Sequence, residues 1–119
     1  ILLINESELR LLCNNDYDDL KELTLGLLDL GIDTVVVKQG SKGVFAINNS
    51  QECFVEAYEC EVVDTTGAGD SFNSGFLYSF LKGYDLEKSC QIGNWVASKA
   101  IQGFGMEKNV HCQECGNAT

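Results

Sequence analysis

The chain has 119 residues, of which 45% are hydrophobic, and a formal net charge of −10 from 18 acidic and 8 basic side chains. This length suits one domain whose core needs no disulfides, and the hydrophobic content excludes a disordered chain. The acidic balance argues against nucleic acid and anionic membrane as partners, because phosphate-rich surfaces attract clustered cations. No stretch approaches the roughly 18 apolar residues of a membrane-spanning helix, so we expect no membrane partner.

The first residues predict a buried strand, and we expect the chain to begin in the middle of that strand. Residues 1–4 are apolar, and neither a positively charged region nor a small-residue cleavage site marks them as a signal peptide. The chain has no initiating Met. We therefore expect a piece of a longer protein of the cytoplasm.

Two helices are predicted next. Residues 6–12 form a short amphipathic helix that Asn14 and Asn15 end. Asp16 can cap a second helix, which Gly31 closes in a left-handed conformation. Its apolar side repeats at spacings of three and four residues and consists of Tyr17, Leu20, Leu23, Leu27 and Leu30.

Extended segments follow. Residues 34–37 form a β-branched run typical of a strand buried on both faces. A turn at residues 40–43 leads to a strand at 44–47, a hairpin turn at 48–50 and an alternating strand at 52–57. Residues 61–63 form a last short extended piece.

From Ser71 onward the spacing of the apolar residues becomes helical. A helix that begins at Gly69 or Asp70 and ends at Gly83 has an apolar stripe of Phe72, Phe76, Leu77, Phe80 and Leu81. Asp85 can cap a final helix, whose predicted buried side is Leu86, Cys90, Val96, Ala97, Ala100 and Ile101. The alternation of helices and strands, with one antiparallel hairpin, predicts an α/β fold.

The six cysteines are irregularly spaced at positions 13, 53, 60, 90, 112 and 115. Without a secretory segment, this spacing favours reduced thiols in a cytoplasmic protein. Cys112 and Cys115 form the one patterned pair, after His111. A structural zinc site usually needs two such pairs, so ordinary thiols are the favoured interpretation, with metal binding as the alternative.

Polar and small residues are concentrated between residues 63 and 75. A strand end is followed by a glycine-rich loop and then by a helix start, where free backbone N–H groups and the helix dipole can hold an anion such as phosphate. The loop lacks the Lys of a P-loop. Asp70 would oppose an anion there unless it takes a proton from an attacking hydroxyl. The alternative is structural, with Asp70 as a helix cap and the glycines as a tight connection.

Residues 64–75 (Asp-Thr-Thr-Gly-Ala-Gly-Asp-Ser-Phe-Asn-Ser-Gly) resemble the second signature of the ribokinase-like (PfkB) family of carbohydrate kinases. Three further stretches follow the family's order and spacing. Residues 5–8 resemble its N-x-x-E motif, residues 38–44 its nucleotide-phosphate loop, and residues 94–105 its last nucleotide-contacting helix and the turn after it.

The resemblance implies catalytic roles around the signature. Asp70 would be the base that activates a hydroxyl of the acceptor. The backbone amides of Gly67, Ala68, Gly69 and Asp70 would form the hole that stabilises charge on the transferred γ-phosphoryl group.

The resemblance also implies binding sites for ATP and two metal ions. Asn5 and Glu8 would hold Mg²⁺ through water, and their alternative role is to cap a short helix. The residues implied at the nucleotide are Lys38, Gly40, Ser41, Gly43 and Asn94. A monovalent cation, typically K⁺, would use the oxygens of Asp64 and Thr66 and the main-chain carbonyls of Ala100, Gly103 and Gly105.

The fold implied is the C-terminal portion of a three-layer α/β/α ribokinase-like architecture with a β-hairpin, without the N-terminal half and its lid. We expect residues 1–119 to form a single partial domain, in which residues 107–119 are a tail that differs from the family. In relatives the other half supplies the sugar site and often the dimer contact. We therefore expect the fragment alone to be inactive, while the full-length protein could form a homodimer.

The activity implied is ATP-dependent transfer of the γ-phosphate to a hydroxyl of a sugar, as in fructokinase and ribokinase. Thr66 favours a sugar over a nucleoside, because adenosine kinases of the family usually have Asn there. The alternative is a non-catalytic nucleotide-binding or regulatory domain derived from such a kinase. The presence of Asp70 favours the enzyme, since a domain that only binds nucleotide needs no base.

Overall fold

The computed structural model describes residues 1–57 and 68–101. The helices and strands follow one another in the order β1 (Leu2–Asn5), α1 (Glu6–Cys13), α2 (Leu20–Asp29), β2 (Thr34–Lys38), the 3₁₀ turn η1 (Gly40–Lys42), β3 (Val44–Asn48), β4 (Glu52–Val55), α3 (Ala68–Leu81) and α4 (Leu86–Ile101). The segment predicted to be extended at 61–63 and the glycines predicted to end α4 lie outside the described residues.

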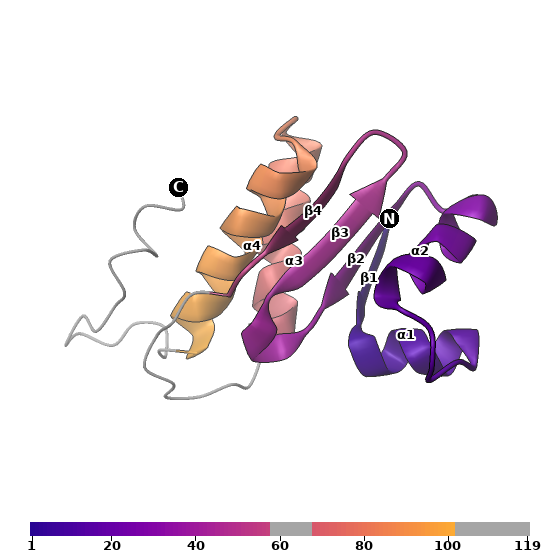
Figure 1. The fold of residues 1–119 in the computed structure, drawn as a ribbon. Coiled ribbons are helices and arrows are strands. Elements are labelled where there is room, and N and C mark those ends of the chain that lie inside the picture. The colour runs from indigo at the N-terminus through magenta and orange to yellow at the C-terminus, as the bar shows by residue number, and fades with distance from the viewer. Residues whose placement is uncertain (58–67, 102–119) are drawn as a thin grey trace.

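The four strands form one mixed sheet in the order β1-β2-β3-β4. β1 runs parallel to β2, while β2 with β3 and β3 with β4 are antiparallel. Helices α1 and α2 connect the parallel pair, because parallel neighbours need a crossover. These helices cover one face of the sheet, and α3 and α4 cover the other (Figure 1). The described residues therefore form the three α/β/α layers that the resemblance implies.

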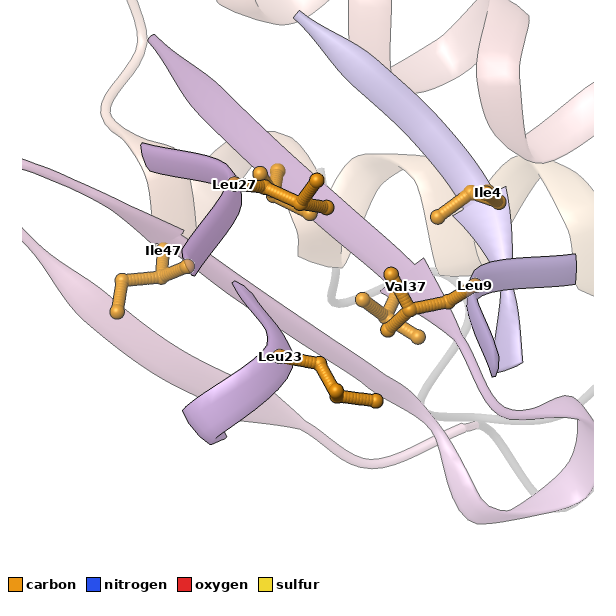
Figure 2. Close-up of a cluster of buried hydrophobic side chains, with 7 residues drawn as sticks. Ile4, Leu9, Leu23, Leu27, Val37 and Ile47 are labelled. Atoms are coloured by element: carbon orange, nitrogen blue, oxygen red, sulfur yellow. The ribbon is translucent and has the colours of Figure 1, made fainter. Parts of the chain in front are cut away.

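Strand β2 is the centre of both cores. Val35, Val36 and Val37 are fully buried, which confirms a strand buried on both faces. Because successive side chains of a strand point to opposite faces, Val35 and Val37 belong to the core with α1 and α2, and Val36 to the core with α3 and α4. Figure 2 shows the first of these cores, which contains Ile4, Leu9, Leu23, Leu27, Val35, Val37 and Ile47.

Helices α3 and α4 pack closely over the second core. Phe72 and Phe76 stack with ring centroids 6.0 Å apart, and Phe76 and Phe80 with centroids 5.3 Å apart. The two helices meet at glycines. A Cβ atom added at Gly93 would lie 2.7 Å from the Phe72 ring, and one at Gly75 would lie 2.8 Å from Cγ2 of Val96.

The start of α2 differs from the prediction. The helix begins at Leu20 after Asp19 at the N-cap position, so Asp16 is not its cap. The Asn15 side chain accepts hydrogen bonds from the backbone N–H groups of Tyr17 and Asp18, both at 2.9 Å. This local turn competes with helix formation, and it leaves Tyr17 94% exposed.

Three other predicted core or strand positions are wrong. Leu30 and Leu81 are about four-fifths exposed, at 82% and 78%. Leu30 lies beyond the last residue of α2, at its C-cap, and Leu81 lies 100° around the axis of α3 from Phe80. β4 ends at Val55 rather than at Ala57. By contrast, Gly31 has the predicted left-handed conformation, with φ of 107°, and Gly83, which was predicted to end α3, has φ of 106°.

The described cysteines, Cys13, Cys53 and Cys90, are free thiols, as predicted. A hydrogen bond between the thiols of Cys53 and Cys90, together with burial, raises the pKa of Cys90. His111, Cys112 and Cys115 lie outside the described residues. None of the described helices is long and apolar enough to cross a membrane.

Candidate functional site

The predicted site residues of β1, α1 and β2 meet at one edge of the sheet. Parallel strands bring their carboxyl ends to the same edge, and the register pairs Asn5, the last residue of β1, with Lys38, the last residue of β2. The first turn of α3 lies next to Lys38, because a Cβ atom at Gly69 would be 3.8 Å from Nζ of Lys38. Three separate stretches of sequence therefore converge here.

Asn5 and Glu8 form a capping box at the start of α1. Oδ1 of Asn5 accepts from the backbone N–H of Glu8 at 2.8 Å, and Oε1 of Glu8 accepts from the backbone N–H of Asn5 at 3.2 Å. The structural alternative for this pair is therefore confirmed. The box uses one carboxylate oxygen of Glu8, whose side chain is exposed, so the pair still offers hard oxygen atoms suited to the water ligands of Mg²⁺.

Lys38 lies among the charged groups of the site. Its Nζ donates to Oδ1 of Asn73 on α3 at 2.9 Å. Burial lowers the pKa of Lys38, while attraction to the carboxylates of Glu8 and Asp70 acts in the opposite direction. The ammonium group of Lys38 thus interacts with both the carboxylate predicted to hold magnesium and the carboxylate predicted to act as base.

An open cleft of about 370 Å³ borders Lys38. Its lining residues are Asn5, Glu6, Ser7, Arg10, Lys38, Gln39 and Lys42. Three of the eight basic residues of the chain therefore line one cleft. Arg10 pairs with Glu6 at 3.2 Å, and Gln39 Nε2 donates to the same carboxylate at 3.4 Å. The cleft is basic on a strongly acidic chain, which suits an anionic ligand.

Gly43 and Asn94 both lie against the end of β4, at Val55 and Glu56. Gly43 has φ of 129°, and a Cβ atom there would collide with the carbonyl oxygen of Val55. The Asn94 side chain is buried and donates from Nδ2 to the carbonyl oxygens of Glu56 at 3.1 Å and Val55 at 3.4 Å. Gly43 leaves room for this segment and Asn94 holds it by hydrogen bonds, while the nucleotide contacts expected of the two residues stay predictions.

The remaining predicted site residues are divided between described and undescribed parts of the chain. α3 begins at Ala68, one residue before the predicted start, and places Asp70 in its exposed first turn. Gly40 and Ser41 lie exposed in η1, and Ala100 is buried near the end of α4. The predicted site residues that lie outside the described parts of the chain are Asp64, Thr66, Gly67, Gly103 and Gly105. Within residues 1–57 and 68–101, no three His, Cys, Asp or Glu side chains gather as a metal site.

The sequence prediction did not include Asn73, Arg10, Gln39 or Lys42 among the site residues. Asn73 was identifiable in principle, because it follows Gly69 by four positions and so shares its helix face. Gln39 and Lys42 lie within residues 38–44, the stretch that resembles the nucleotide-phosphate loop, although neither was named as a site residue. For Arg10 no local signal exists, because its position in the cleft depends on the pairing of β1 with β2.

Comparisons with known proteins identify relatives of this chain. Residues 1–111 match the family of pfkB carbohydrate kinases. An uncharacterized sugar kinase of Archaeoglobus fulgidus is 41% identical over 92% of this chain and 43% of its own length. A nucleoside kinase of Methanocaldococcus jannaschii is 38% identical over 66% of this chain and 26% of its own length.

A solved structure gives the same comparison in three dimensions. An Escherichia coli protein of the ribokinase II type, in complex with ATP and Mg²⁺, has a TM-score of 0.77 and 27% identity over 98% of this chain and 38% of its own. The chain therefore spans less than half the length of each of these relatives.

Proposed function

Because the chain belongs to the pfkB family of carbohydrate kinases, we propose that its protein transfers the γ-phosphate of ATP to a hydroxyl of a sugar. The observation that carries this proposal is the position of Lys38. Its ammonium lies at the first turn of α3, close to the charges of Glu8 and Asp70, and beside a basic cleft. Such a site can bind a polyanion on an acidic protein, because the charges act locally.

In this proposal Asp70 is the catalytic base. It takes the proton of the acceptor hydroxyl as that oxygen forms a bond to the γ-phosphorus atom, and the bond from this phosphorus to the bridging oxygen breaks, so that ADP leaves with the electron pair. The first N–H groups of a helix have no intrahelical partners. The amides of Gly67, Ala68, Gly69 and Asp70 are therefore proposed as the hole for the transferred group.

The phosphate chain of ATP is proposed to extend from α3 along η1 and the cleft. Lys38, Gly40, Ser41 and Gly43 would contact it, and Asn94 would lie toward the ribose or base. Arg10 and Lys42 line the same cleft and join this group. The E. coli relative that was solved with ATP and Mg²⁺ supports this nucleotide.

Two metal ions belong to the proposal. Asn5 and Glu8 would hold Mg²⁺ through its water ligands, and the ion would supply positive charge at the phosphates. A monovalent cation, K⁺, would be held by Asp64, Thr66 and the carbonyls of Ala100, Gly103 and Gly105. All of these are oxygen donors suited to a hard cation.

The test is the substitution Asp70→Asn in the full-length protein that contains this chain. We expect transfer from ATP to hexoses, pentoses or sugar acids to fall by several orders of magnitude, while ATP affinity changes little, because Asn cannot take the proton. The matched control is Asp33→Asn, at an exposed loop residue before β2. Replacing K⁺ by Na⁺ in the same assay tests the monovalent site.

Three outcomes would count against the proposal. If Asp70→Asn retained the wild-type rate, Asp70 would not be the catalytic base. If the rate were the same in Na⁺ as in K⁺, the proposed role of a K⁺ ion would be wrong. Binding of ATP by the wild-type full-length protein without transfer to any acceptor would identify a regulatory nucleotide-binding domain instead.

A further inference from the structure

We propose that Asn73 is a positioning residue that holds the Lys38 ammonium over the first turn of α3, where this ammonium contacts the phosphoryl group in transfer. This inference rests on the proposed kinase function and adds to it a residue and a role. The hydrogen bond from Nζ of Lys38 to Oδ1 of Asn73, 2.9 Å long, joins residues that are 35 positions apart.

Helix geometry explains why Asn73 can do this. Gly69 and Asn73 are four residues apart in α3, so they lie one above the other on the same face. The contact distance of 3.8 Å at Gly69 and the hydrogen bond at Asn73 show that this face turns toward β2. The lysine side chain therefore runs along the N-terminal turn of α3, with its head fixed one turn into the helix.

The chemistry of the contact suits a phosphate ligand. An ammonium has three N–H donors, and Asn73 occupies one of them. A neutral amide oxygen orients the ammonium without cancelling its charge, whereas a carboxylate at this position would form an ion pair that competes with phosphate. The lysine side chain is long and flexible, so a fixed contact in the free protein reduces the ordering that ligand binding has to supply.

The charged groups around Lys38 come from two neighbouring elements. Glu8 of α1 and Asp70 of α3 both attract its ammonium. Glu8 could draw the flexible side chain away from α3, and Asp70 could hold it in an ion pair at the first turn of the helix. Asn73 supplies the directional contact that keeps it there, and we infer that without this contact the ammonium is distributed among the carboxylates.

The kinetic test uses a double-mutant cycle in the full-length protein. We expect Asn73→Ala to lower kcat/KM by about tenfold to a hundredfold, the usual effect of losing one hydrogen bond to a charged group. Lys38→Met should cost more, about a hundredfold to a thousandfold. In the Lys38→Met background, Asn73→Ala should cost less than about twofold, because the group it positions is gone.

Controls separate positioning from folding. Asn73→Ser keeps an oxygen acceptor and should retain more activity than Asn73→Ala at an unchanged melting temperature. Asn49→Ala, in the exposed turn between β3 and β4, is the matched control and should leave the rate unchanged. The inference would be overturned if Asn73→Ala had the kcat/KM of the wild type. It would also be overturned if Asn73→Ala lowered kcat/KM equally in the wild type and in Lys38→Met.

A readout that needs no activity distinguishes this inference from the proposed function. ¹⁵N NMR of the lysine ammonium groups should show slowed proton exchange at Lys38 in the wild type and in Asn49→Ala, and fast exchange in Asn73→Ala. If the wild-type protein phosphorylates no acceptor, the kinase proposal fails, yet this spectrum still decides the contact. Fast exchange at Lys38 in the wild type would refute the contact itself.

Discussion

Lys38 shows how a single charge can decide the chemistry of a site on a chain of opposite net charge. The chain carries −10, but its local field at the end of β2 depends on one half-buried ammonium and two neighbouring basic residues. Burial makes this charge costly, since the charged form loses hydration. A residue kept at such a cost is a candidate for function rather than for stability.

Stability at high pH tests this cost. Burial lowers the pKa of Lys38 in the folded protein below its ordinary value of 10.5. Between the lowered pKa and 10.5 the unfolded chain binds more protons than the folded one, so the free energy of unfolding rises with pH in that window. We expect Lys38→Met, which has no charge to desolvate, to lose this rise and to be at least as stable as the wild type at pH 7.

The measurement is urea unfolding of both proteins at pH 7, 9 and 10. Lys21→Met, at an exposed lysine of α2, is the matched control and should keep the pH dependence of the wild type. A Lys38→Met variant that unfolds more easily than the wild type at pH 7 would show that Lys38 stabilises the fold. Its role would then be structural.

At the scale of elements, the close approach of α3 and α4 depends on residues without side chains. Gly75 and Gly93 occupy positions where a Cβ atom would collide with Val96 and Phe72. Phe72 is buried in the core beneath the sheet's second face and packs in a stacked row with Phe76. The N-terminal turn of α3 holds the proposed base, so the packing of these helices also places Asp70.

Two glycine substitutions should therefore have opposite effects. We expect Gly93→Ala to lower the free energy of unfolding by about 1–3 kcal/mol, because the Phe72 ring must shift in a packed core. Gly26→Ala, in the middle of α2 with no atom within 4 Å of the new Cβ, should raise it by about 0.4–1 kcal/mol, since alanine loses less entropy in a helix. Chemical denaturation measures both, and a stable Gly93→Ala would contradict this account of the helix interface.

At the scale of the whole molecule, the chain is shorter than the relatives it matches. It covers 43% of the A. fulgidus sugar kinase and 38% of the E. coli structure with ATP. β1 is an edge strand of the described sheet, and an edge strand has backbone groups that can pair with a further strand. The phosphate side of the proposed site lies within this chain, whereas the sugar side is proposed to lie in the remainder of the protein.

The 119-residue chain alone is therefore expected to bind ATP and Mg²⁺ without transferring phosphate to a sugar. Calorimetry measures the expected nucleotide binding. An assay of ADP release with hexoses, pentoses and sugar acids measures the expected absence of transfer. The full-length protein under the same conditions is the control. Sugar phosphorylation by the isolated chain would show that residues 1–119 contain the acceptor site.

Local signals in the sequence determined several parts of the structure. The run of valines in β2 predicted a strand buried on both faces, and Gly31 and Gly83 predicted the helix ends, because burial pattern and backbone conformation depend on near neighbours. The predicted start of α2 was wrong because a local turn competed with the helix. Asp16 was predicted as its cap, but the hydrogen bonds of the Asn15 turn favour a later start at Leu20, with Asp19 at the N-cap position.

The sequence by itself determined the family, the α/β class and the stretches that carry the proposed chemistry, because motifs are contiguous and their spacing is visible. Only the tertiary structure showed that Lys38 contacts Asn73, that Arg10 and Lys42 share a cleft, and that Gly43 and Asn94 lie against the end of β4. These contacts join residues far apart in the chain. They follow from the register of β1 against β2 and from the packing of α3 and α4 on the sheet, which no local pattern specifies.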